Sequence, residues 1–268
     1  MTTSPTSPTH SRECEPFYFG AKYYDAIHAT KDYEREAKAV AHHLKLGRSS
    51  RIVEFGCGTG QFLRHFAKWD RTLVGVDISL PMIHVASQKF GNLEIHAKFI
   101  PADFFTATHI LASYPPYDAA FSMFGVMSYA SVRESIVDLL RCVRYRLSPG
   151  SRFVFDVVNY ACCAAHLRKH AMTTYATPDG PLHRHIEKTF DVQSSVLSNK
   201  ITYEVAGQTC VENHEMRAFT PSEIRDAAER ADFKVIGTYP GFDSPVSDDH
   251  GSAFIQASDF YFVTVLES

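Results

Sequence analysis

A glycine-rich segment directly after a short apolar run constrains the fold of this chain more than any other feature of its sequence. The run 51–53 leads into Glu54-Phe55-Gly56-Cys57-Gly58-Thr59-Gly60, and the next apolar run, 73–76, is closed by Asp77. This order predicts a strand, a glycine loop, a helix and a second strand that ends in a carboxylate. Glycines let a ligand approach the backbone, a helix N-terminus presents unpaired N–H groups, and the acid can take two ribose hydroxyls. We therefore expect a site for an adenosine-containing cofactor.

The spacing of the glycines argues against a dinucleotide. The dinucleotide fingerprint GxGxxG needs its third glycine at position 61, but the chain has Gln61 there and a glycine one place earlier, at Gly60. A carboxylate at the strand end, Glu54, suits a ligand with an ammonium or sulfonium group better than one with phosphates. The loop therefore indicates a cofactor that carries positive charge.

Three acids at the ends of successive apolar runs carry a resemblance to a known family. A third acid follows Glu54 and Asp77 in the segment Pro101-Ala102-Asp103-Phe104. With the ExGxGxG loop, these acids resemble the pattern of class I S-adenosylmethionine-dependent methyltransferases. The resemblance implies S-adenosyl-L-methionine as the cofactor, with Asp77 at the ribose and Asp103 with Phe104 at the adenine. The cofactor-binding residues that we predict are Tyr24, Tyr33, Glu54, Gly56, Gly58, Gly60, Asp77, Ile78, Met82, Asp103, Phe104 and Phe121.

Each of the three acids also stands where a simple N-cap residue would stand before a helix. An N-cap carboxylate accepts a hydrogen bond from the first turn of the helix and needs no ligand. This structural role is the alternative to cofactor binding at each position.

Further stretches are similar to the small-molecule branch of that family, which includes deoxysugar N,N-dimethyltransferases and relatives of glycine N-methyltransferase. The similarity runs in order over roughly residues 18–266 and is carried by segments 24–33, 122–129 and 212–220. The sugar enzymes have a histidine proposed as base where this chain has Tyr129, and a hydroxyl-bearing aromatic residue where it has His28. Either these two roles are exchanged or the substrate differs. The catalytic residues that we predict are His28, Tyr129 and His214, with a structural role as the alternative for each histidine.

The charge and composition of the chain disfavour some classes of substrate and partner and indicate where in the cell the protein is located. The formal net charge of −3 and the pI near 6.5 disfavour a nucleic acid substrate, which needs clustered Lys and Arg to neutralise phosphates. The six cysteines have no metal-ligand spacing, so we expect no metal. Without a run of about 18 apolar residues or a secretory h-region, we expect no membrane partner and a reduced, cytoplasmic protein.

The acceptor that these observations favour is an amine or hydroxyl of a small molecule, with an amino sugar or a natural-product intermediate as candidates. A homodimer is a candidate assembly. Two other classes stay open. One is a methyltransferase acting on protein or nucleic acid, and the other is a non-catalytic cofactor-binding relative or a misread nicotinamide oxidoreductase.

The alternation of strands and helices from residue 51 predicts an α/β fold with a Rossmann-like sheet of seven strands. We expect strands near 51–55, 72–77, 98–101, 117–122, 151–157, 233–239 and 258–266, and helices near 34–46, 59–68, 80–89, 131–146 and 221–230. Polar and apolar residues alternate over 183–217, which predicts inserted antiparallel strands. The predicted organisation is a disordered tail at 1–16, a cofactor-binding core with an N-terminal lid at 17–159, an antiparallel substrate-side insertion at 160–217 and the C-terminal part of the core at 218–268.

Overall fold

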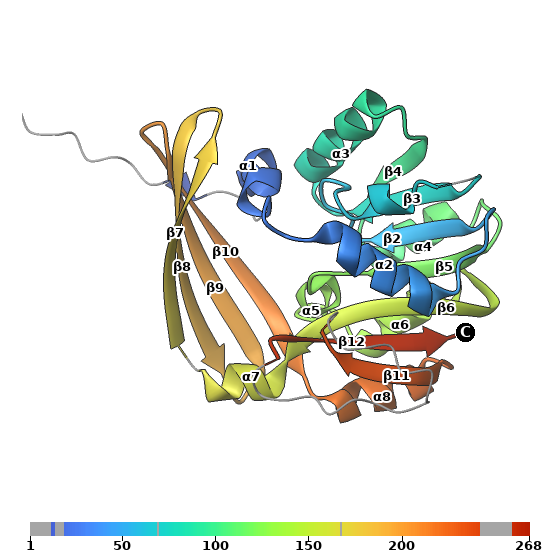
Figure 1. Cartoon of the computed structure of the whole chain (residues 1–268). Helices are drawn as coiled ribbons and strands as arrows, with labels where there is room; N and C mark the ends of the chain where they lie inside the picture. Colours follow the sequence, from blue (N-terminus) through green and yellow to red (C-terminus); the bar gives the residue numbers. More distant parts are fainter. Residues whose placement is uncertain (1–11, 14–18, 69, 167, 242–258) are drawn as a thin grey trace, which may run out of the picture.

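The structure, a computed structural model, describes residues 12–13, 19–68, 70–166, 168–241 and 259–268 (Figure 1). The strands of the core sheet, in spatial order, are β4 (Ala97–Pro101), β3 (Thr72–Asp77), β2 (Arg51–Phe55), β5 (Tyr117–Ser122), β6 (Leu147–Asn159), β12 (Tyr261–Glu267) and β11 (Lys234–Pro240). The first five are parallel, whereas β12 is antiparallel to both of its neighbours, β6 and β11. This confirms the predicted Rossmann-like sheet. Ligands of such sheets bind at the carboxyl ends of the parallel strands.

Helices cover both faces of the core sheet. They are α2 (Tyr33–Leu44), η1 (Leu63–Phe66), α3 (Leu80–Asn92), α4 (Phe104–Leu111), α5 (Val126–Ala130), α6 (Ile136–Arg144) and α8 (Pro221–Arg230). Residues of α4, α6 and α8 pack in one apolar cluster, and residues of α2, η1 and α3 pack in another. The strand β2 contributes Val53 and Phe55 to the first cluster and Ile52 to the second. Burial on both faces explains why the strands are continuous apolar runs in the sequence.

The insertion is an antiparallel sheet that stands beside the core. Its strands are β7 (Arg168–Thr177), β8 (Gly180–Asp191), β9 (Val196–Val205) and β10 (Gln208–Phe219), preceded by α7 (Tyr160–Ala165). The last residues of β10 pair in parallel with the end of β6, so hydrogen bonds continue from one sheet into the other. The antiparallel strands expected over 183–217 are confirmed, and β7 extends the insertion by one strand.

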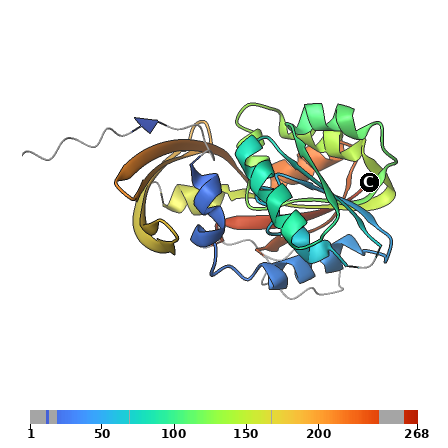
Figure 2. The same ribbon diagram turned by 90° about the horizontal axis from the view of Figure 1, so that it is seen from above.

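The helix α1 (Gly20–Ile27) lies between the insertion and the core, where we expected a lid (Figures 1 and 2). The strand β1 (Arg12–Glu13) pairs with β10, so the prediction of a disordered tail is wrong for these two residues. The rest of the predicted tail and most of the long loop after Gly241 lie outside the described residues.

The prediction of a helix at 59–68 is wrong, because only the 3-10 helix η1 forms there. Gly58 and Gly60 have positive φ values of 51° and 70°, which keep the chain out of a right-handed helix until the loop is complete. The helix expected at 131–146 begins at Ile136 and ends at Arg144, since the separate helix α5 precedes it and β6 already begins at Leu147. We did not anticipate α4.

Among the described cysteines, four are free thiols and one is not. Cys57, Cys142, Cys162 and Cys163 are free and buried. Cys210 is disulfide-bonded, which departs from the expectation of a reduced protein. No helix within the described parts of the chain is long and apolar enough to cross a bilayer.

The start of α8 allows a direct test of local stability. Thr220 Oγ1 accepts a hydrogen bond from the Glu223 N–H, and Glu223 Oε2 accepts one from the Thr220 N–H, which is a capping box. We expect Thr220→Ala to lower the free energy of unfolding by about 1 kcal/mol in urea denaturation. The neighbouring exposed Ser222→Ala should change it by less than about 0.5 kcal/mol. Equal losses in the two variants would contradict a capping role.

Candidate functional site

The glycine loop is a tight turn fastened to the neighbouring strand. Gly56, Gly58 and Gly60 all have positive φ values, of 75°, 51° and 70°. A Cβ at Gly56 would collide with Val126, and one at Gly60 would come within 2.7 Å of Phe90, so both positions need glycine on steric grounds as well. A Cβ at Gly58 would meet nothing within 4 Å. The middle glycine therefore borders open space at the carboxyl end of β2.

Asp77, at the end of β3, joins this loop to the start of α3. Its Oδ2 accepts a hydrogen bond from the Gly58 N–H at 2.7 Å, and its Oδ1 accepts one from the Ser79 N–H at 2.8 Å. Burial raises the pKa of the carboxyl. Each oxygen of a carboxylate has a second lone pair, so these two bonds leave room for ligand hydroxyls.

Glu54 is the most unusual carboxylate of the site. Its side chain is 1% exposed, and its Oε2 has no hydrogen-bond partner among the described residues. Burial, and then the neighbouring charge of Asp77, raise its pKa well above the usual range. Burying an unpartnered charge is strongly unfavourable, and a cation bound nearby would offset both effects. The residues present therefore fit a positively charged ligand, as a sulfonium cofactor with an ammonium group would be.

Three tyrosines from separate elements surround these acids. Burial raises the pKa of Tyr24 on α1, and Tyr33, Tyr129, Asp77 and Glu54 raise it further, which places all of them around one phenol. The Tyr33 hydroxyl is buried and has no partner within the described chain. The structure thus brings together four predicted cofactor residues and one predicted catalytic residue.

Tyr261 on β12 is a fourth tyrosine at this place, which sequence analysis did not find. Burial raises its pKa, and Asp156, Tyr129 and Tyr24 raise it further. No sequence signal marked it, because β12 is more than a hundred residues from the glycine loop in the sequence.

Other predicted cofactor residues lie at the edge of the site or behind it. Asp103 is exposed and caps α4, with Oδ1 accepting from the Thr106 N–H at 2.7 Å, so the N-cap alternative is observed here. Phe104 is buried and stacks on Phe55 at a centroid distance of 5.0 Å. The remaining three differ in exposure: Ile78 is 69% exposed, Met82 is buried and Phe121 is fully buried in a core cluster. Their contact with a cofactor stays a prediction.

His28, directly after α1, is held as a neutral imidazole. Its ring lies against Tyr24, with centroids 4.5 Å apart. Burial, and then the charges of Arg184 and Lys31, lower its pKa to about 4. The side chain is therefore uncharged near neutral pH and able to accept a proton.

His214, on β10, belongs to a group of hydrogen bonds between the insertion and α1. Its Nε2 lies 3.1 Å from Glu212 Oε2, and its ring meets Tyr129 edge-on at 5.9 Å. The other oxygen, Glu212 Oε1, accepts hydrogen bonds from the N–H groups of Phe19 and Gly20 at the start of α1. This pair therefore ties the insertion to α1.

A second set of contacts ties α1 to the glycine loop. Asp25 Oδ1 accepts a hydrogen bond from Thr59 Oγ1 at 2.7 Å, and Asp25 Oδ2 forms an ion pair with Lys89 Nζ at 2.6 Å. Lys89 also donates to Thr59 Oγ1 at 3.1 Å. The helix α1 is thus anchored on both sides, to the core by Asp25 and to the insertion by Glu212.

Asp156, on β6, is a further buried residue near the candidate site that sequence analysis missed. It is fully buried and accepts hydrogen bonds from the N–H groups of Phe124 and Gly125, which have φ values of 68° and 78°. Burial raises its pKa to about 6. A lone acid inside the apolar run 153–158 was the available signal. Asp156 fixes the strained turn that leads into α5 and Tyr129.

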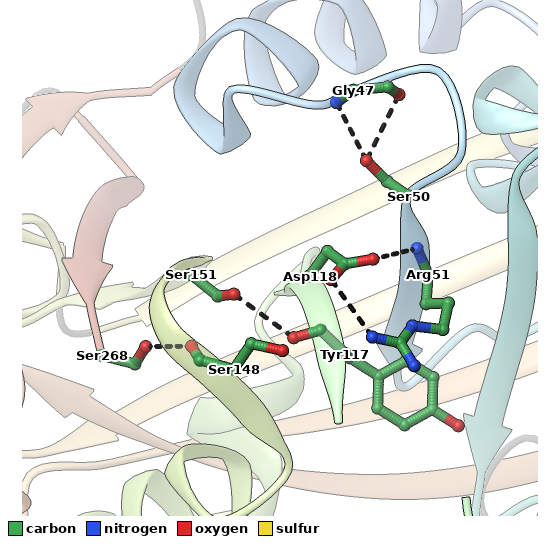
Figure 3. A network of polar contacts seen from close by, with 8 residues as sticks. All are labelled: Gly47, Ser50, Arg51, Tyr117, Asp118, Ser148, Ser151 and Ser268. Carbon is green, nitrogen blue, oxygen red and sulfur yellow. Dashed lines mark hydrogen bonds and ion pairs between the residues drawn. The ribbon is translucent and has the colours of Figure 1, made fainter. Parts of the chain in front are cut away.

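The opposite edge of the sheet offers a contrast. There Asp118 accepts a hydrogen bond from the Arg51 N–H at 2.7 Å, and Ser268 Oγ donates to the Ser148 carbonyl at 2.7 Å (Figure 3). These contacts join strand ends and use ordinary paired groups. Within the described residues, no cluster of His, Cys, Asp and Glu is arranged to hold a metal ion.

Comparisons with known proteins agree with this geometry. A family profile described as "Methyltransferase domain" matches residues 27–238. The chain is 31% identical over 80 residues to a dTDP-3-amino-3,6-dideoxy-alpha-D-glucopyranose N,N-dimethyltransferase from Streptomyces fradiae, over 28% of this chain. That alignment spans 31% of the relative's length, and one with a second curated relative, from Bacillus subtilis, spans 53% of its length.

Solved structures share the fold at low identity. An S-adenosylmethionine-dependent methyltransferase from Clostridium acetobutylicum has a TM-score of 0.71 at 16% identity, covering 93% of this chain and 97% of its own. The S-adenosylmethionine-bound amino pentose methyltransferase CalS10 from Micromonospora echinaspora has a TM-score of 0.64 at 16% identity, covering 96% and 99%.

The buried imidazole of His28 gives a prediction on stability and pH. Its pKa is near 6.5 when unfolded and about 4 when folded, so between these values the unfolded state binds more protons. Stability contributed by neutral His28 is present above about pH 6.5 and is lost as the pH falls toward 4, by up to about 3 kcal/mol. His28→Phe should remove this part of the pH dependence in urea denaturation.

His43 provides a positive control for that measurement. Burial lowers its pKa to about 4 as well, but it lies on α2 against Tyr239. His43→Phe should therefore reduce the pH dependence of stability in the same way. If His43→Phe does so and His28→Phe matches the parent protein, His28 is solvated and the prediction is wrong.

Proposed function

The chain belongs to the class I S-adenosylmethionine-dependent methyltransferases, and from this premise we propose that it methylates an amine or hydroxyl of a small molecule. The observation that carries the proposal is the double anchoring of α1. The start of this helix is bound to Glu212 of the insertion, and Asp25 in its last turn is bound to Thr59 of the glycine loop. A site closed on two sides by fixed elements suits a small acceptor better than a folded macromolecule.

The names of relatives support an amino sugar as the acceptor. The relative from Streptomyces fradiae is named for an amino-deoxyglucose, and CalS10 is named as an amino pentose methyltransferase. We propose an acceptor of this kind, a polar ring compound with an amino or hydroxyl group.

Some of the residues that would hold the cofactor would act through their charge, and others through the space and surface that they provide. When bound, S-adenosylmethionine supplies an electrophilic methyl group on a positively charged sulfur. Beside a bound cation, Glu54 and Asp77 would be ionised, and burial would strengthen the attraction because little water screens it. Gly58 leaves the backbone open to close approach, and Tyr24 and Tyr33 provide apolar walls with hydroxyl groups.

His28 is the residue that we propose as proton acceptor. Orienting two reactants contributes roughly 7–11 kcal/mol to a displacement of this kind, whereas a general base contributes about 3–5.5 kcal/mol. An amine that binds uncharged needs no base during transfer. The neutral imidazole, with a pKa of about 4, can accept a hydrogen bond from its N–H and can pass the product's proton on to water, but it does not retain that proton. A hydroxyl acceptor needs a stronger base. The weak basicity of His28 therefore favours an amine.

The proposal is tested by turnover with methyl-labelled S-adenosylmethionine. Pools of amino sugars, sugars without amino groups, proteins and RNA are incubated with the enzyme, and labelled product is counted. We expect label in the amino-sugar pool and a rise in melting temperature with S-adenosylmethionine or S-adenosylhomocysteine. Label in the protein or RNA pool alone would overturn the small-molecule proposal. Thermal stabilisation and no label in any pool would indicate a non-catalytic relative.

Glu54→Gln should have opposite effects on stability and on ligand affinity. The ligand-free variant should melt at a higher temperature, because the parent buries a carboxylate oxygen without a partner. Its affinity for S-adenosylmethionine in calorimetry should fall at least about tenfold, the loss of one charge-assisted interaction. Asp118→Asn, at the opposite edge of the sheet, should leave the affinity unchanged. A variant that binds as tightly as the parent would remove Glu54 from the cofactor site.

A further inference from the structure

One face of the insertion looks toward the candidate active site. Successive residues of a strand point to opposite faces, so residues in register on neighbouring strands share a face. Leu182 and Tyr203 of this face pack with Tyr23 and Ile27 of α1. Leu197 of the same face packs in a cluster with which Tyr129 is also in contact. The inward face therefore lies opposite the carboxyl edge of the core.

A row of polar residues crosses this inward face. Lys188 on β8 is in register with Asn199 on β9, and Asn199 is in register with His214 on β10. In a parallel row, Arg184 on β8 is in register with Tyr203. The polar row thus ends at His214, which touches the predicted catalytic Tyr129.

Arg184 is a half-buried cation without an acidic partner. Its Nε is buried and has no hydrogen-bond partner, and no carboxylate of the described residues lies within 4.0 Å of its guanidinium. After burial, its charge is the next cause that lowers the pKa of His28, and it opposes the rise that burial causes in the pKa of Tyr129. The guanidinium therefore lies close to the groups that would face the acceptor.

Lys188 and Asn199 lie on the same inward face of the insertion as Arg184. Burial, together with the charges of Lys169 and Arg184, lowers the pKa of Lys188, and its ammonium group lies over the ring of Phe260 at 4.5 Å. No ion pair is formed by Lys188 with a described acid. Asn199 is 7% exposed, and among the described residues its amide nitrogen donates only to Met216 Sδ, at 3.8 Å, so one N–H is left to donate to an anion.

Cations elsewhere in this region are neutralised. Lys22 pairs with Asp179 at 2.6 Å, Lys89 with Asp25 at 2.6 Å and Lys31 with Glu36 at 3.5 Å. Half-buried charges are unfavourable unless they are paired. The two basic residues of β8 are thus left without the partner that their neighbours have.

We propose that Arg184, Lys188 and Asn199 form a subsite for an anionic group of the acceptor, a phosphate or a carboxylate. This inference rests on the proposed function, since it assigns the acceptor a negative charge. The guanidinium of Arg184 can bind either group through two parallel hydrogen bonds, and Lys188 adds a point charge. Because the two residues are four positions apart on one strand, about 13 Å along the backbone, a group with several anionic oxygens fits them best.

The test uses the protein saturated with S-adenosylhomocysteine and inorganic anions as probes. Pyrophosphate, phosphate and acetate are titrated in calorimetry, and each is tested as an inhibitor of turnover. We expect pyrophosphate to bind most tightly and to compete with the acceptor but not with S-adenosylmethionine. Acetate binding as tightly as phosphate would assign the subsite to a carboxylate instead. Pyrophosphate that competes with S-adenosylmethionine would place the anion in the cofactor site and overturn the proposal.

Substitutions distinguish anion binding at this subsite from a nonspecific attraction of anions to the protein. Arg184→Gln and Lys188→Gln should each weaken pyrophosphate binding about tenfold or more, and Arg184→Lys should weaken it less than Arg184→Gln. The control is Lys200→Gln, one residue from Asn199 on the exposed face of β9, which should change nothing. Equal losses in all variants, or no loss in Arg184→Gln, would overturn the proposal.

The failure of this inference can be told from the failure of the proposed function. S-adenosylhomocysteine affinity, measured in each variant, should equal that of the parent because Arg184 and Lys188 lie on the insertion. Turnover of an amino acceptor with no pyrophosphate binding would retain the proposed function and reject the subsite. Pyrophosphate binding with no methyl transfer to any small molecule would retain the anion site and reject its assignment to an acceptor.

Discussion

The site depends on two buried acids, Glu54 and Asp77, that stand where β2 and β3 end. Asp77 is satisfied by the N–H groups of Gly58 and Ser79, and it holds the glycine loop in place by these bonds. Glu54, beside it, is buried with one oxygen that no described group meets. The loop is therefore held in place by Asp77, whereas one oxygen of Glu54 lacks a positively charged or hydrogen-bonding partner among the described residues. Both properties follow from the position of two acids at adjacent strand ends. We propose that a sulfonium ligand supplies the missing positive charge, so that a fold shared with dinucleotide enzymes would select a cation.

Local signals predicted most of the core. The strands β2, β3 and β5 and the helix α8 have the predicted boundaries, because each is an apolar run or helical segment bounded by turn or capping residues. The helix expected at 59–68 failed since the positive φ of Gly60 belongs to a loop that propensity does not describe. We considered Asp103 both as a ligand residue and as an N-cap, but placed no helix after it, and it caps α4. Both errors have the same cause: a residue type, Gly in one case and Asp in the other, can serve more than one structural role.

The parts of the site that could not be predicted are contacts between distant segments. Glu212 meets Gly20 across 192 positions of sequence, and nothing near either residue announces the partner. The burial of Asp156 and the proximity of Arg184 to His28 likewise arise from packing between the core and the insertion. Sequence patterns identified residues of the right chemical types, whereas their protonation and pairing came from tertiary structure. The catalytic residues were accordingly the hardest to assign.

The pairing of β10 with β6 has a consequence for how such a protein changes its specificity. Since the two sheets share hydrogen bonds at Ala218 and Phe219, the insertion keeps its orientation to the core whatever side chains it carries. Point replacements at inward positions of β7, β8 and β9 can then alter the acceptor while the nucleoside end is untouched. A one-residue deletion in one of these strands would instead turn the inward side chains on one side of the deletion to the outer face. Divergence of the family at the acceptor is thus expected to proceed by exchange of side chains at constant strand length.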